Sequence, residues 1–221
     1  MSSEARKEFD KELATLQEDL RKMGTVVEEM LDKAIEALKT RNIALAREVI
    51  ELDDIVDNYN IDIEARSLRL LALQQPMARD LRIIAAAMKI ITDVERAGDY
   101  SVDIAKIAEK LADKPLFKPL EDIPKMVSIV QEMLRETLTA FVTHDLHLVE
   151  QMVAHDDEVD HLYNSLYEEL IGYIKKNPDL TDQAIGLLLI ARYLERIADH
   201  ITNIGERIYY METGKLKELH Q

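Results

Sequence analysis

Apolar residues recur every three or four positions over long stretches of this chain, which is the period of one face of an α-helix. The clearest stretch consists of Leu187, Ile190, Leu194, Ile197, Ile201, Ile204 and Ile208. A matching stretch lies one hundred residues earlier, at Ala87, Ile90, Val94, Ala97, Ser101 and Ile104, and only the serine departs from it in kind. This match at a fixed offset indicates an internal duplication.

The pattern predicts six long helices separated by short breaks. Asn42 and Asp145 stand where their side chains can cap the second and fifth helices, and proline follows Gln-Gln at 74–75 and Asn177. The residue before a proline disfavours the helical conformation, so both positions predict turns. The expected helices cover residues 4–38, 43–73, 77–112, 125–143, 146–176 and 182–213, and Gly214 ends the last.

The one sustained non-helical stretch, residues 113–124, contains Pro115, Pro119 and Pro124 and divides the chain into two halves. Each half has three helices with short connections, which pack as an antiparallel three-helix bundle. No part of the pattern predicts a strand. We therefore expect an all-α fold of two tandem bundles, residues 1–112 and 125–214, joined by this linker and followed by a short tail at 215–221.

Composition narrows the range of functions. The 221 residues include 43 acidic and 28 basic side chains, for a net charge of −15, so the chain repels nucleic acid. Cysteine is absent, which excludes disulfides and thiolate metal sites. The N-terminal residues lack the apolar run of a secretory signal, and the longest apolar runs are too short to span a bilayer. We expect a cytoplasmic protein that does not insert into the membrane.

The most informative polar residues form four pairs of carboxylates. The members of a pair are four residues apart and therefore stack on one face of a helix. The pairs are Asp53 with Asp57, Glu95 with Asp99, Asp156 with Asp160, and Glu195 with Asp199. One such pair says little, because a chain with 43 acidic residues produces several by chance.

The register of the pairs carries more information. In the first half both pairs lie some 30 Å from the same turn, at roughly 1.5 Å per residue, so an antiparallel hairpin brings them level. In the second half the two distances differ by about one helical turn, which is within the precision of the predicted helix ends. Four carboxylates at one level in each half indicate a site for a cation.

A helical wheel with about 100° per residue places the pairs away from the apolar face, on a surface shared by neighbouring helices. Oxygen ligands of this kind suit hard or borderline cations such as Mg²⁺, Mn²⁺, Ca²⁺ or iron. His161 and His200 adjoin the clusters and either contribute or are solvated. A di-iron centre buried in the bundle needs two Glu-x-x-His motifs, and only Glu158 and His161 supply one.

Three segments carry a resemblance to a known family: Gln-Pro-Met-Ala-Arg-Asp-Leu-Arg at 75–82, Glu-Arg-Ala-Gly-Asp at 95–99 and Glu-Arg-Ile-Ala-Asp-His at 195–200. The chain resembles the PhoU family of phosphate-regulon regulators over essentially its whole length, including the duplication. The resemblance implies six helices in two three-helix bundles. It also implies that the four carboxylate pairs bind metal ions or multinuclear clusters of iron, zinc, manganese or magnesium.

The resemblance further implies a homodimeric negative regulator that couples the ATPase of a phosphate ABC transporter to a sensor histidine kinase. It adds Asp103, Asn203 and His200 as secondary metal ligands. Tyr100 stands where the family commonly has histidine, and Asp103 where it commonly has asparagine, so the two halves need not hold the same metal.

Arg79, Asp80 and Arg82 form a candidate partner-binding corner at the start of the third helix. Chemistry alone favours ordinary surface charge for them.

Three functions stay open at this point. The leading one is a non-enzymatic regulator that binds metal and docks on partner proteins. The second is a helical scaffold whose acidic faces bind basic partners, with metal binding incidental. The third is a carboxylate-bridged metalloenzyme, although the sequence has no phosphate-binding glycine loop, nucleophile elbow or catalytic triad.

Overall fold

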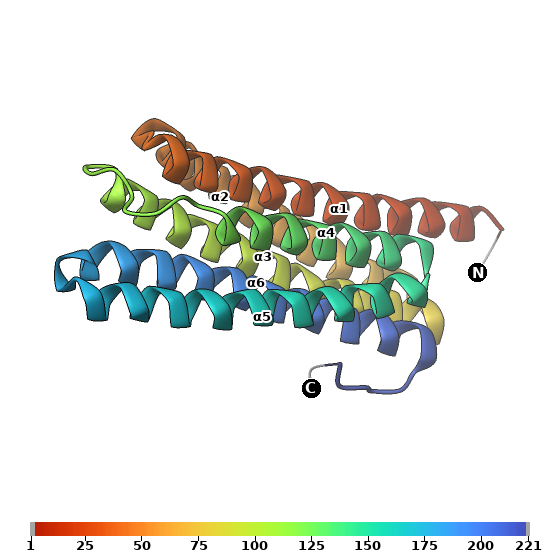
Figure 1. Cartoon of the computed structure of the whole chain (residues 1–221). Coiled ribbons are helices and arrows are strands. Elements are labelled where there is room, and N and C mark those ends of the chain that lie inside the picture. Colours follow the sequence, from red (N-terminus) through yellow and green to blue (C-terminus); the bar gives the residue numbers. More distant parts are fainter. Residues whose placement is uncertain (1–2, 220–221) are drawn as a thin grey trace.

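The computed structural model describes residues 3–219, which are helical almost throughout (Figure 1). The helices are α1 (Ser3–Thr40), α2 (Ile43–Gln74), α3 (Arg79–Leu111), α4 (Asp122–Thr143), α5 (Leu146–Lys176) and α6 (Thr181–Thr213), with one 3₁₀ turn at Pro178–Leu180. No strand occurs in this range. The all-α fold of six long helices is confirmed.

Local chemistry explains where the helices begin. The side chain of Asn42 accepts hydrogen bonds from the backbone N–H groups of Ala44 and Leu45, at 3.0 and 3.4 Å. Asp145 accepts one from His147, at 2.9 Å. These three bonds satisfy donors that have no partner within the helix, so the two capping predictions are confirmed.

Two helix starts differ from the sequence prediction by two residues or more. α4 begins at Asp122, so Pro124 lies in its first turn and not in the linker. Proline is tolerated there because the first helical N–H groups have no intrahelical partner. α3 begins at Arg79 and not at residue 77, because Gln75 and Ala78 adopt positive φ angles of 46° and 50°, which interrupt the helix.

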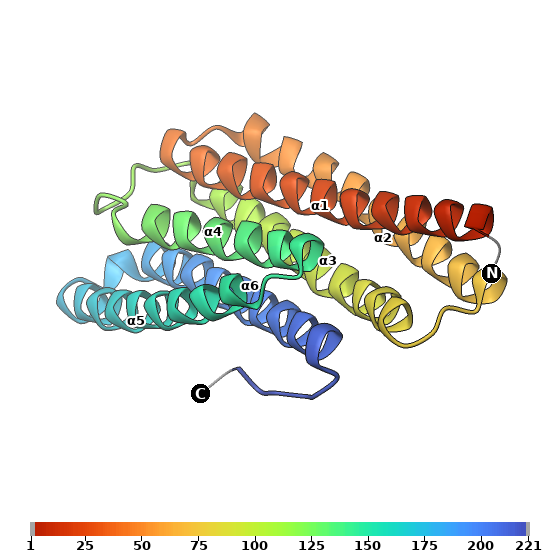
Figure 2. The same ribbon diagram turned by 90° about the vertical axis from the view of Figure 1, so that its right-hand side faces the viewer.

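The axes of the six helices are roughly aligned, consecutive helices run antiparallel, and the two halves lie side by side (Figures 1 and 2). Helices α1, α2 and α3 contact one another, as do α4, α5 and α6. The two halves meet mainly where α3 packs on α6, and also where α1 packs on α4. The apolar faces of α3 and α6 are therefore buried against each other and form the middle of a continuous hydrophobic core.

α1 and α4 approach each other closely at Gly24. A Cβ atom at this position would lie 2.1 Å from Cδ1 of Leu138, a distance that no real contact allows. Within the core, the hydroxyl of Ser101 donates to the carbonyl of Ala97 at 2.8 Å, which satisfies the one polar residue of the α3 apolar stretch. None of the helices in residues 3–219 combines the length and the hydropathy needed to cross a bilayer.

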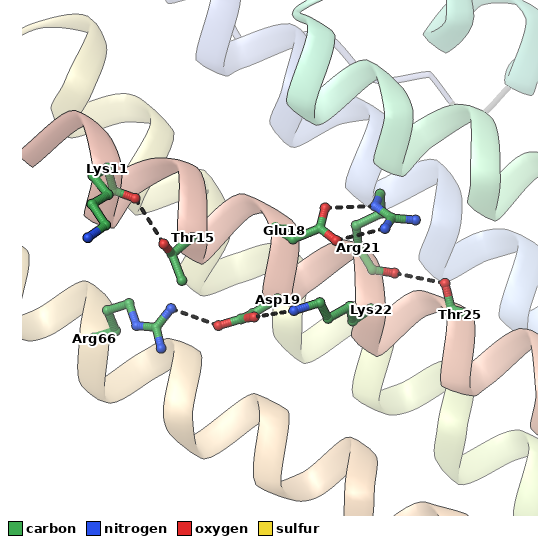
Figure 3. Close-up of polar contacts among 8 residues, drawn as sticks. All are labelled: Lys11, Thr15, Glu18, Asp19, Arg21, Lys22, Thr25 and Arg66. Atoms are coloured by element: carbon green, nitrogen blue, oxygen red, sulfur yellow. Dashed lines mark hydrogen bonds and ion pairs between the residues drawn. The ribbon is translucent and has the colours of Figure 1, made fainter.

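Opposite charges pair across the outer surface of α1 and α2. Figure 3 shows Arg66 of α2 donating to Asp19 of α1 at 2.7 Å, while Lys22 contacts the same carboxylate at 3.3 Å. Pairs of this kind at partly exposed positions stabilise a fold only modestly. They do show that acidic side chains on this surface have basic partners.

Candidate metal centre

The first acidic cluster consists of Asp53 and Asp57 of α2 with Glu95 and Asp99 of α3. The structure brings these side chains together, since the charges of Asp57 and Asp99 act on Asp53, and those of Asp99, Asp57 and Asp53 act on Glu95. α2 comes close to α3 at Gly98, where a Cβ atom would lie 3.5 Å from Oδ1 of Asp53. The level predicted from the α2–α3 turn is therefore correct.

Asp53 is the most perturbed member of this cluster. Its Oδ1 is buried and accepts no hydrogen bond from any residue in the described range. Burial, together with repulsion by Asp57 and Asp99, raises the pKa of Asp53 to about 6. Burial and then Asp99 also raise the pKa of Glu95. A buried carboxylate without a hydrogen-bond donor is destabilising unless a cation or a proton compensates it.

A surface cavity of about 320 Å³ opens beside the cluster, and Asp53, Asp99, Asp103, Tyr100 and His200 all line it. Basic side chains take part as well, because Arg96 contacts Asp99 at 2.9 Å and Lys106 contacts Asp103 at 3.4 Å. These two cations neutralise part of the negative charge from the exposed side. The buried Oδ1 of Asp53 is outside their hydrogen-bonding reach.

His200 reaches this cavity from α6, across the interface between the two halves. Its ring contacts Asp93 of α3, with 2.9 Å between Nδ1 and Oδ1. The imidazole therefore lies beside the first cluster, although its place in the sequence follows the second. At the equivalent contact of the duplicated structure, Tyr100 stacks on Tyr193, with 5.5 Å between ring centroids. The hundred-residue offset relates the Asp93–His200 contact to the Tyr100–Tyr193 contact. The sequence did not predict that His200 of the second half would lie beside the cluster of the first half.

The second acidic cluster consists of Asp156 and Asp160 of α5 with Glu195 and Asp199 of α6. Burial raises the pKa of Glu195, and Asp199 and Asp160 raise it further, against the opposing effect of Arg192 and Arg196. Asp160 of α5 thus lies close enough to Glu195 of α6 for its charge to act across the helix pair.

Glu195 resembles Asp53 in its surroundings. Its Oε2 is buried and accepts no hydrogen bond within residues 3–219, and its side chain is only 12% exposed. Arg192 contacts the other carboxylate oxygen, while Arg196 contacts Asp199 at 3.2 Å. Asn203, the remaining secondary candidate, is half-buried one turn beyond Asp199. Each half therefore contains one orphaned, buried carboxylate oxygen in an acidic cluster between two helices.

The donor set fits a hard or borderline cation. Each cluster offers four carboxylates, and the first adds Asp103 and the imidazole of His200 at its cavity. The alternative of a di-iron centre inside the bundle does not fit. Glu158 pairs with Lys125 at 2.7 Å and His161 is exposed, so neither side chain points into the core.

The candidate partner-binding corner is tied to the rest of the molecule. Arg79 contacts Glu212 at 3.3 Å, Arg82 donates to the carbonyl of Met211 at 2.8 Å, and Asp80 contacts Arg6 at 2.5 Å. The arginines thus join α3 to the end of α6. Their role in binding a partner stays a prediction.

Comparison with known proteins supports the duplicated fold. The family model of the PhoU domain matches the chain twice, over residues 20–108 and 123–208. The chain belongs to the PhoU family. The two matches confirm the internal duplication, and each PhoU domain contains one acidic cluster.

Relatives match over nearly their full length. A phosphate-specific transport system accessory protein PhoU homolog of Aquifex aeolicus is 42% identical, with 93% of each chain covered. Its counterpart in Clostridium acetobutylicum is 36% identical over 97% of this chain and 98% of the relative.

The crystal structure of PhoU from Pseudomonas aeruginosa matches with a TM-score of 0.88 at 32% identity, covering 94% of this chain and all of that one. The structure of the phosphate transport system regulatory protein PhoU from Streptococcus pneumoniae gives the same score at 33% identity, covering 95% and 99%.

Proposed function

We propose that this PhoU-family protein is a metal-binding accessory protein of phosphate transport that acts as a negative regulator of phosphate uptake. In this proposal it couples the ATPase of a phosphate ABC transporter to a sensor histidine kinase, and it works as a homodimer in the cytoplasm. The descriptions of its relatives as transport-system accessory proteins support the general role.

The observation that carries metal binding is the pair of orphaned carboxylate oxygens, Oδ1 of Asp53 and Oε2 of Glu195. Each is buried, lacks a hydrogen-bond donor in the described part of the chain, and sits among like charges. A protein that only needed negative surface charge would have no reason to bury these oxygens. A bound cation would satisfy them and remove the repulsion.

The two clusters join neighbouring helices, which gives metal binding a structural consequence. Asp53 and Asp57 would hold α2 to Glu95 and Asp99 of α3, and the second cluster would hold α5 to α6 in the same way. A metal bound between two helices supplies positive charge to both. It would therefore change the charge and rigidity of the face that partner proteins meet.

Metal analysis of the purified protein tests this proposal. The test variant combines Asp99→Asn with Asp199→Asn, one change in each cluster. The matched control combines Asp54→Asn with Asp157→Asn, two exposed carboxylates next to the clusters on α2 and α5. We expect the test variant to lose bound metal and the control to keep it. Equal metal content in the wild type and the test variant would exclude the clusters as the sites.

A second function, an acidic scaffold with incidental metal binding, predicts a different result in a partner-binding assay. The transporter ATPase and the sensor kinase are captured by the wild type with and without EDTA, and by the Asp99/Asp199 variant. Metal-dependent regulation predicts that EDTA and the double substitution weaken capture to a similar extent. Capture that is insensitive to both favours the scaffold. The metalloenzyme alternative receives no support from the relatives, which are described as accessory proteins.

A further inference from the structure

The surface between α1 and α2 and its counterpart between α4 and α5 differ in how their carboxylates are compensated. Across α1 and α2, acidic side chains face basic ones at ion-pair distance. The pairs are Lys33 with Glu48 at 2.6 Å, Arg66 with Asp19 at 2.7 Å, and Arg69 with Glu12 at 3.4 Å. Figure 3 shows the Arg66–Asp19 pair.

Between α4 and α5 one pair of the same kind occurs, Lys125 with Glu158 at 2.7 Å. About two turns further along α4, Glu132 and Glu136 face α5, where they meet the imidazole of His155. One ligand atom from each of the three side chains lies within 4.8 Å of the other two. Within the described range, no lysine or arginine comes within ion-pair distance of either glutamate.

This group is also partly withdrawn from solvent. The side chain of Glu136 is 16% exposed and that of His155 is 26% exposed. The two carboxylates and the imidazole thus lie together without a lysine or arginine of the described residues at ion-pair distance, whereas the carboxylates across α1 and α2 have such partners.

We propose that Glu132, Glu136 and His155 form a third metal site, which takes a borderline divalent cation of the Zn²⁺ class. An imidazole together with carboxylates is a donor set that suits Zn²⁺, whereas Mg²⁺ and Ca²⁺ prefer oxygen ligands alone. The site lies between α4 and α5, so it is distinct from the second acidic cluster between α5 and α6. It depends on different residues from those of the proposed function.

The geometry is close to what the ion requires. Ligand atoms around a tetrahedral Zn²⁺ at roughly 2.0–2.1 Å stand roughly 3.3 Å apart, so small side-chain rotations bring the three atoms to bonding distance. Nδ1 of His155 is 3.1 Å from Oε2 of Glu136, which already orients the ring toward the carboxylates. Glu132 is exposed and free of other ion pairs in the described range, so it supplies the adjustable ligand, and water completes the coordination.

Nuclear magnetic resonance of the histidine rings tests the site directly. The full-length protein is stripped with EDTA and then titrated with ZnCl₂ up to a fivefold excess, while the ¹⁵N shifts of the imidazoles are followed. His155→Gln assigns the His155 signals, and circular dichroism checks that this variant stays helical. We expect the Nδ1 signal of His155 to move to a metal-bound shift in the wild type and to stay in place in the Glu132→Gln/Glu136→Gln variant.

His147 serves as the internal control, because it lies on the same helix and also faces a carboxylate, Glu150 at 3.7 Å, but has no second carboxylate partner among residues 3–219. Its signals should not move. Unchanged His155 signals at fivefold Zn²⁺ would overturn the proposal, as would equal shifts at His147 and His155.

Zn²⁺ counting separates this site from the acidic clusters. In the Asp99→Asn/Asp199→Asn background, equilibrium dialysis should find one bound Zn²⁺ that His155→Gln removes and His147→Gln leaves. If the clusters do not bind metal, this equivalent is still present in the wild type. If His155→Gln leaves the count unchanged, the third site is refuted whatever the clusters bind.

Discussion

Replacing Asp53 by asparagine should stabilise the metal-free protein, although it removes a charged side chain from a protein's surface groove. Burial and the neighbouring carboxylates raise the pKa of Asp53 from 3.8 to about 6. A shift of about two units corresponds to roughly 3 kcal/mol. Because Asp53 is only half-buried, solvent screening reduces this to about 1–2 kcal/mol. Asparagine fills nearly the same volume, carries no charge and offers an amide donor to the other carboxylates.

The sign follows from proton binding. The folded state holds the Asp53 proton more tightly than the unfolded state does, so the wild type loses stability as pH rises from about 4 to about 6. Above that range the destabilisation is complete. The advantage of Asp53→Asn is therefore full at pH 7.5, falls by about half near pH 5, and vanishes below about pH 4.

Thermal unfolding in EDTA measures the effect. At pH 7.5 the melting temperature of Asp53→Asn should exceed that of the wild type by roughly 2–8 °C, given about 2–4 °C per kcal/mol for a chain of this size. Asp54→Asn makes the same change in net charge at an exposed neighbour and should have little effect. A less stable Asp53→Asn, or an equal gain in Asp54→Asn, would refute the reasoning. With metal at a hundredfold its dissociation constant, the order should reverse, because the wild type alone gains about 2.7 kcal/mol.

Three further predictions concern the fold and are checked by urea unfolding. Gly24→Ala should lower the free energy of unfolding by roughly 1–3 kcal/mol, because the new Cβ collides with Leu138. Gly172→Ala, whose Cβ meets no atom within 4 Å, should raise it by about 0.5–1 kcal/mol. A gain in stability in both variants would contradict the close approach of α1 and α4. Asn42→Ala should lose about 0.5–2 kcal/mol because α2 loses its cap, and Asn42→Ser, which keeps a capping oxygen, should lose less. Phe141→Ala should lose about 3–5 kcal/mol because the ring is fully buried; a loss below 1 kcal/mol would show that the α4 end is not part of the core.

Most of the fold could be predicted from the sequence, because helix periodicity and capping depend on residues that are close together in the chain. Asn42, Asp145 and Gly214 mark helix ends through interactions with their own segment, and the structure places the ends there. The start of α3 could not be predicted as well from the sequence. It depends on positive φ angles at Gln75 and Ala78, and neither glutamine nor alanine is a residue type that favours such angles.

The acidic clusters were predictable for a different reason. Two helices joined by a tight turn have a fixed register, so counting from the turn brings Asp53 level with Asp99. The burial of Asp53 was not predictable in this way, because it results from the contact with Gly98 across the helix pair. Likewise, the position of His200 beside the first cluster depends on how α3 packs against α6. Counting residues along one helix does not predict such a contact.

The third group, Glu132, Glu136 and His155, shows the same limit. The two glutamates are four residues apart, a spacing that is common in this acidic chain. The feature that sets them apart is the imidazole of His155, which lies on the face of α5 that these glutamates contact. Only the packing of α4 on α5 reveals that difference.

Anomalous diffraction tests the central claim most directly. Crystals of the full-length protein, grown without chelator and soaked in turn with iron(II) and with zinc, are measured on both sides of each metal's absorption edge. The account predicts anomalous peaks between α2 and α3 at Asp53 and Asp99, and between α5 and α6 at Asp160 and Glu195. Metal-saturated crystals with no peak at either acidic cluster would contradict it.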